Sequence, residues 1–155
     1  MPLAATPLFW WWALVDEEGF YVKYAALARF MQGVDKRDPE LHAYEPRFEL
    51  NGERTDKDEF SSTCVKSPTH ALCWIYRTGS FGEIEPRTAP AVEGLAVLLR
   101  DMADGPYEAV FWDTHSGQPV QSVVAEADDG RLRLAVPPFA RDIAIKIGQR
   151  GRNQD

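Results

Sequence analysis

Residues 120–136 read VQSVVAEADDGRLRLAV, two strand-like runs on either side of Asp128-Asp129-Gly130. An Asp-Gly pair between runs of alternating apolar residues is the strongest local signal for a tight β-hairpin. The second run places Leu132, Leu134 and Val136 at every other position, so one face of that strand is predicted to be buried. This hairpin indicates an antiparallel β protein, and the same pattern recurs on both sides of it.

Strand-like segments continue along the chain from residue 42 onward. About seven or eight short segments, rich in β-branched and aromatic residues, alternate with turn signals. Such spacing is typical of an antiparallel β-sandwich, immunoglobulin-like or related, which makes the fold mainly β and which we place at residues 42–148. The predicted strands lie at 43–50, 60–66, 71–77, 92–99, 107–113, 120–127, 131–136 and 142–147.

A short strand and one α-helix are predicted in front of the sandwich. The apolar run from Ala4 to Val15 has the length of a short buried strand. From Gly19 to Gln32 apolar residues recur at helical spacing, in the stripe Phe20, Tyr24, Leu27 and Met31, which Tyr21, Ala28 and Phe30 widen. Residues 1–41 are therefore predicted to be a strand-helix appendage, and residues 149–155 a flexible polar tail.

Length and charge exclude several classes of protein. The chain has 155 residues, and 24 acidic against 17 basic side chains give a net charge of −7, which argues against nucleic-acid binding. The chain is too short for a complete (β/α)₈ barrel, which typically needs about 250 residues. The apolar run from Leu8 to Val15 is far shorter than the ~20 residues that span a bilayer, so we expect no membrane association. No signal peptide is visible, and the sequence assigns no compartment.

The two cysteines, Cys64 and Cys73, flank Ser67-Pro68-Thr69-His70, which is predicted to be a four-residue hairpin loop. That loop places the cysteines opposite each other, with Cβ atoms about 4.5–5.5 Å apart, close to disulfide range. Two interpretations stay open: a cross-strand disulfide, or two reduced cysteines packed as small apolar side chains. Their spacing does not fit a zinc site.

Five tryptophans are many for this length, and Trp10, Trp11 and Trp12 are consecutive. Residues 7–12, PLFWWW, and residues 26–30, ALARF, resemble the last strand and helix of (β/α)₈ glycoside hydrolases related to cellulases. By this resemblance, one residue of the tryptophan triplet is similar to the aromatic side chain that forms the floor of the −1 sugar site in such barrels.

The sandwich region resembles the small C-terminal β-sandwich of the same kind of enzyme, in the segments 71–76, 105–114 and 134–139. In that family the catalytic carboxylates lie on earlier barrel strands, which have no counterpart here, so no catalytic residue is carried over. The resemblance thus implies a non-catalytic C-terminal accessory region of a glycoside-hydrolase-like protein, inactive alone. Enzymes of this kind are often secreted.

The tryptophan triplet predicts a partner surface. In a strand, Trp10 and Trp12 point to one face and Trp11 to the other, so at least one face needs a cover. The predicted partners are the missing catalytic barrel, a second copy of the chain that pairs through this segment, or a glycan.

The alternative function is a free-standing β-sandwich module that binds carbohydrate or protein. Sugar rings stack on aromatic faces, and the candidate carbohydrate contacts are Trp10, Trp11, Trp12, Trp112, Asp113 and His115, with Trp74 and Tyr76 second. The competing interpretation is that Trp74 and Trp112 serve packing. His42, His70 and His115 lack metal-ligand spacing and no cofactor motif occurs, so we predict no metal, no cofactor and no catalytic residue.

Overall fold

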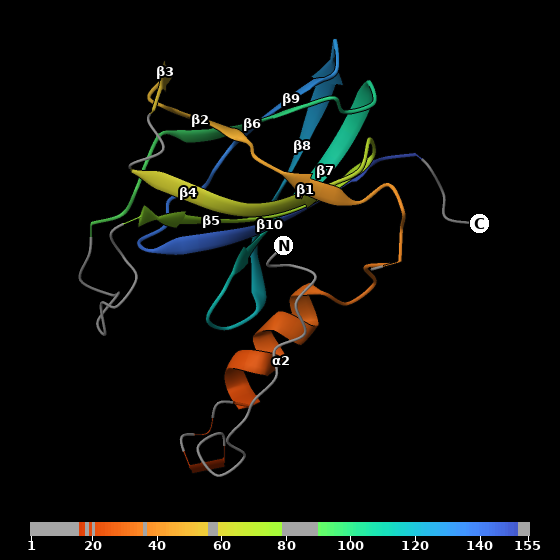
Figure 1. The fold of residues 1–155 in the computed structure, drawn as a ribbon. Coiled ribbons are helices and arrows are strands. Elements are labelled where there is room, and N and C mark those ends of the chain that lie inside the picture. The colour runs from red at the N-terminus through yellow and green to blue at the C-terminus, as the bar shows by residue number, and fades with distance from the viewer. Residues whose placement is uncertain are drawn as a thin grey trace.

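A computed structural model describes residues 16–17, 19, 21–35, 37–55, 59–78 and 90–151 of the chain (Figure 1). This part of the chain contains ten strands and the helix α2, Tyr21–Phe30. The strands are β1 (His42–Tyr44), β2 (Arg47–Leu50), β3 (Glu53–Arg54), β4 (Phe60–Lys66), β5 (His70–Arg77), β6 (Leu95–Arg100), β7 (Gly105–Asp113), β8 (Gln118–Asp128), β9 (Arg131–Ala135) and β10 (Asp142–Gln149).

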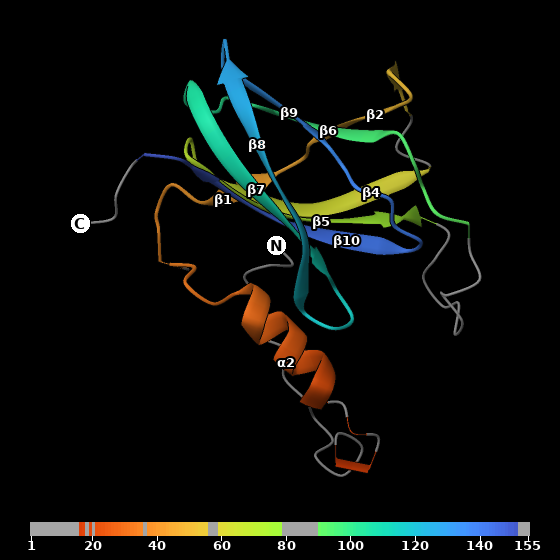
Figure 2. The same ribbon diagram turned by 180° about the vertical axis from the view of Figure 1, so that it is seen from behind.

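All ten strands belong to one antiparallel sheet in the order β1-β4-β5-β10-β7-β8-β9-β6-β2-β3. The sheet curls so that one half, from β1 to β8, lies across from the other half, from β9 to β3 (Figures 1 and 2). The predicted mainly β, antiparallel, sandwich-like architecture is confirmed. The strand number exceeds the prediction because Pro46 divides the predicted strand 43–50 into β1 and β2, and β3 follows the Asn51-Gly52 turn.

The core fills the space between the two halves. Its residues come from alternate positions of facing strands, as the period of two requires. Leu132 and Leu134 of β9, the first predicted buried face, are at most 1% exposed. Across the core, the ring of Phe60 in β4 lies 6.3 Å from that of Phe48 in β2 and 6.5 Å from that of Phe139. These contacts join the two halves.

A lysine and a tyrosine close one side of the sandwich. Lys66 is 2% exposed, and its Nζ donates a 2.9 Å hydrogen bond to the carbonyl of Asp101. The same Nζ lies 5.0 Å from the centre of the Tyr44 ring, and the Tyr44 hydroxyl accepts a 2.8 Å bond from the backbone N–H of Arg100. Burial lowers the pKa of Lys66. The end of β4 is thereby tied to the end of β6.

The hairpin of β4 and β5 has the predicted register, with Cys64 opposite Cys73, and the two residues form a disulfide. The loop between them is closed by a 2.8 Å hydrogen bond from the N–H of Ser67 to the carbonyl of His70. Both cysteines are buried, at 4% and 1% exposure. Of the two interpretations left open by the sequence, the disulfide is confirmed.

The helix α2 lies inside the predicted range 19–32, whereas the predicted strand from Ala4 to Val15 lies outside the described residues. Its buried side agrees with the predicted stripe only in part: Phe30 packs on Trp112, but Leu27 is 46% exposed and Ala26, outside the stripe, is 3% exposed. The reason is a close approach to Gly117, which has φ +64° and no side chain, so the backbone of Ala26 lies directly on it. No helix among the described residues is long and apolar enough to cross a membrane.

Candidate functional site

An aromatic surface lies on the outer face of the sheet, opposite the core. Ala144 of β10 is paired with Trp74 of β5 on one side and with Trp112 of β7 on the other, so these three residues form a row across three strands. We call Trp74, Tyr76, Trp112, Asp142 and Lys146 the aromatic face. The alternation of each strand brings these side chains together, because they lie at positions opposite to the core residues.

The helix α2 covers the Trp112 end of the aromatic face. The ring of Phe30 meets the ring of Trp112 edge-on, at 5.9 Å between centres and 86° between planes. Lys146 Nζ lies 5.4 Å from the centre of Trp112 and 5.5 Å from that of Phe30, and it donates a 3.0 Å hydrogen bond to the carbonyl of Gln32. Burial lowers the pKa of Lys146. Trp112 is therefore half-buried, with its ring engaged by the helix and the lysine.

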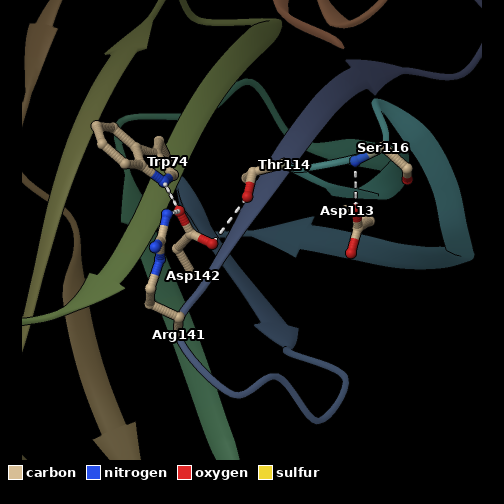
Figure 3. A network of polar contacts seen from close by, with 6 residues as sticks. All are labelled: Trp74, Asp113, Thr114, Ser116, Arg141 and Asp142. Atoms are coloured by element: carbon tan, nitrogen blue, oxygen red, sulfur yellow. Dashed lines mark hydrogen bonds and ion pairs between the residues drawn. The ribbon is translucent and has the colours of Figure 1, made fainter. Parts of the chain in front are cut away.

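The Asp113 carboxylate stabilises the loop that follows β7. The Asp113 carboxylate accepts a 2.6 Å hydrogen bond from the N–H of Ser116 (Figure 3). That backbone donor lowers the pKa of Asp113, with a smaller contribution from the N–H of His115. His115 is exposed on the same loop. Trp112, Asp113 and His115 are thus neighbours in the chain whose described contacts do not converge on one pocket.

At the other end of the aromatic face, the rings of Trp74 and Tyr76 lie together, and Trp74 is hydrogen-bonded to the carboxylate of Asp142. Trp74 and Tyr76 have ring centres 5.0 Å apart with planes inclined by 47°. Trp74 Nε1 donates a 3.0 Å bond to one oxygen of Asp142, and the Thr114 hydroxyl donates a 2.8 Å bond to the other oxygen. Arg141 Nη2 lies 3.9 Å from the first oxygen (Figure 3). With its carboxylate held on both sides, Asp142 sets the orientation of the Trp74 ring.

Sequence reasoning named Trp74 and Tyr76 but missed Asp142 and Thr114. Asp142 is separated from Trp74 by 68 residues and from Thr114 by 28. The acid stands at the start of a predicted strand, and no local pattern distinguishes it from an acid in a turn. Only the pairing of β10 with β5 and β7 could identify it.

The described residues contain no group of three or more His, Cys, Asp or Glu side chains that could hold a metal ion. Two histidines make local contacts: His42 Nδ1 lies 2.9 Å from the carbonyl of Glu40, and His70 Nδ1 lies 2.9 Å from the Thr69 hydroxyl. A hollow of about 210 Å³ beside Leu50 and Arg77 is lined by none of the aromatic-face residues. The aromatic face is therefore the best candidate site in this part of the chain.

Trp10, Trp11 and Trp12, the remaining candidate carbohydrate contacts, lie outside the described residues. Neither a protein-family model nor a curated protein matches the chain. What the fold and the site define is a class: a mainly β, antiparallel, sandwich-like domain with an aromatic outer face and a helix packed on one end of it.

Proposed function

We propose that this chain is a non-catalytic C-terminal accessory region of a glycoside-hydrolase-like protein, inactive by itself. The observation that supports this best is the packing of α2 on the aromatic face, where Phe30, Lys146 and Trp112 meet. The helix belongs to the segment that resembles the end of a glycosidase barrel. Its place on the sheet would therefore fasten the sandwich to the barrel.

The outward side of α2 agrees with such a role. Tyr21 and Leu27 are large apolar side chains that stay 53% and 46% exposed although the opposite side of the helix is packed. Covering them would contribute roughly 25 cal/mol for each Å² of apolar surface removed from water. In the proposed protein, these two side chains lie against the rest of the barrel.

The proposal is tested by assaying the purified chain on aryl glycosides and on polysaccharides. We expect no turnover above that of a heat-denatured sample, because no catalytic carboxylate pair is carried over from the resemblance. Turnover that follows the chain through every purification step would contradict the proposal. As a structural control, Leu27→Glu should leave thermal unfolding unchanged, whereas Ala26→Glu should lower the melting temperature, since Ala26 is buried against the loop between β7 and β8 and Leu27 is exposed.

Glycan binding at the Trp74–Tyr76 end of the aromatic face is the second candidate function. It is favoured by one observation, the Trp74–Tyr76 pair whose orientation Asp142 holds from the side. A preset aromatic surface suits a sugar ring, which stacks its C–H groups on the ring face.

Affinity electrophoresis on soluble glycans tests this second function. We expect retardation of the wild-type chain, loss of retardation in Trp74→Ala and little change in Trp112→Phe, because the Trp112 ring is engaged by α2. If the Trp112 variant alone lost retardation, the predicted contacts around Trp112 would be the site instead. A chain that no glycan retards would have no such function.

A further inference from the structure

The strand β8 has an open edge. It is paired with β7 from Gln118 to Ala127, apart from Val120 at an irregularity of the register, but its other side meets β9 through Ala127 and Asp128 alone. Beyond these two pairs β8 and β9 diverge toward the two halves of the sheet (Figure 2). Residues 118–126 therefore form an edge strand of the first half, and this inference does not depend on the proposed function.

The register of the hairpin shows which backbone groups point outward. Asp129 and Gly130 both have positive φ, 49° and 68°, as a two-residue type I′ turn requires, so Asp128 and Arg131 form a hydrogen-bonded pair. Because N–H and C=O groups alternate sides along a strand, those of Glu126, Val124 and Ser122 are directed away from β7. They are hydrogen-bonding groups without a strand to bind among the described residues.

Apart from Glu126, the side chains on this edge are apolar or neutral. Val124 is 56% exposed, and Val123 and Ala125 are only partly buried where they meet the core. Residues 121–125 carry no charge, although lysines and other charges commonly protect such edges. The protective features present, Pro119 and the irregularity opposite Phe111 and Trp112, affect the beginning of the strand.

We propose that a second copy of this chain pairs with β8 in antiparallel orientation, with the two-fold axis at Val123. In this register Ser122 of each copy lies opposite Val124 of the other, and each such pair exchanges two backbone hydrogen bonds, about four in all. The two Val123 side chains, each only partly buried against its own core, contact each other across the axis.

The distribution of charge favours a second copy of the chain as the partner of the β8 edge. The chain carries a net charge of −7, so two copies repel each other overall. The self-paired stretch 121–125 is uncharged, and Glu126 comes opposite Val120 of the second copy rather than another acid. The backbone-paired residues 121–125 thus oppose no like charges, and the nearest carboxylate on β7, that of Glu108, accepts a 2.8 Å hydrogen bond from the Ser122 hydroxyl.

Val124→Pro is the direct test, because proline removes an N–H that points away from β7 and leaves the β7–β8 ladder intact. Val124→Thr, which keeps the N–H and the branched shape, is its matched control. Sedimentation velocity over a range of concentrations should show a monomer–dimer equilibrium for the wild type and Val124→Thr, and a monomer for Val124→Pro. Far-UV circular dichroism checks that the variants are folded.

A second variant provides the test if the Val124→Pro chain does not fold. Val124→Glu keeps the N–H but brings two carboxylates near the two-fold axis, beside Glu108 of each copy, so it should also be monomeric, and more strongly so at low salt. A wild-type chain that stays monomeric up to its solubility limit would overturn the proposal. So would dimers that persist in Val124→Pro or Val124→Glu, a result that points to the tryptophan triplet as the contact.

Discussion

At the scale of single residues, two carboxylates of similar chemistry have different tasks because of what surrounds them. Asp142 receives side-chain donors from two other parts of the chain, Trp74 and Thr114, so it joins β10 to β5 and to the loop after β7. Asp113 receives backbone donors from its own loop and stabilises the turn between β7 and β8. The first acts between elements, and the second acts within one.

The stabilisation by Asp113 should depend on pH. Hydrogen bonds to the ionised form hold its pKa below the ordinary value of 3.8 in the folded protein. The contribution is therefore complete above pH 3.8 and is lost as the pH falls through the lower pKa of the folded state. Urea unfolding at a series of acidic pH values should show a smaller pH slope for Asp113→Asn than for the wild type. Equal slopes would assign the acid sensitivity to other groups.

At the scale of elements, the position of α2 depends on one glycine in the loop between β7 and β8. A Cβ at Gly117 would overlap the backbone of Ala26, and Arg29 Nη1 donates a 2.8 Å hydrogen bond to the carbonyl of the adjacent Ser116. The helix is thus held by small residues and one directional bond at the loop, and by Phe30 on the sheet.

Gly117→Ala should loosen α2 from the sheet and make Trp112 more accessible to acrylamide quenching. Two effects contribute: the positive φ of +64°, which costs about 1–2 kcal/mol for a non-glycine residue, and the overlap with Ala26. Gly52→Ala is the matched control, because its φ is +86° but no atom lies within 4 Å of the added Cβ. If both variants behave alike, backbone strain alone is responsible and the close packing of α2 contributes nothing.

At the scale of the whole molecule, the two halves of the curled sheet share one core. Phe60 comes from the first half and contacts Phe48 of the second half and Phe139 of the segment that connects them. Lys66 and Tyr44 close the side where β1 and β4 approach the end of β6. Neither half has an apolar face that it can bury alone, so we expect them to unfold together.

Phe60→Ala should therefore destabilise the entire domain, by about 3–5 kcal/mol for a buried aromatic side chain. Phe60 is 1% exposed, whereas the control Val120→Ala changes a side chain that is 55% exposed and should cost less than about 0.5 kcal/mol. Urea unfolding, followed by tryptophan fluorescence and by far-UV circular dichroism, should give coincident transitions for both variants. Two separate transitions would show that the halves fold independently.

Several features of this chain follow from local sequence alone. The hairpin at Asp129-Gly130, the register of Cys64 against Cys73 and the buried face of β9 were all predictable. The physical reason is that turn type and side-chain alternation involve residues close together in the chain. Trp74 and Tyr76 could likewise be singled out as aromatic strand residues.

Tertiary structure alone decided how these elements meet. The insertion of β10 between β5 and β7 brings Asp142 to Trp74, 68 residues away, and Arg29 reaches Ser116 across 87 residues. The helix rests on Ala26 and leaves Leu27 exposed, although Leu27 belonged to the predicted apolar stripe and Ala26 did not. Such contacts depend on which surfaces the whole chain presents to one another, and no stretch of sequence carries that information by itself. The sequence by itself therefore determined the strands and their turns, and the packing of the whole chain determined the aromatic face and the open edge of β8.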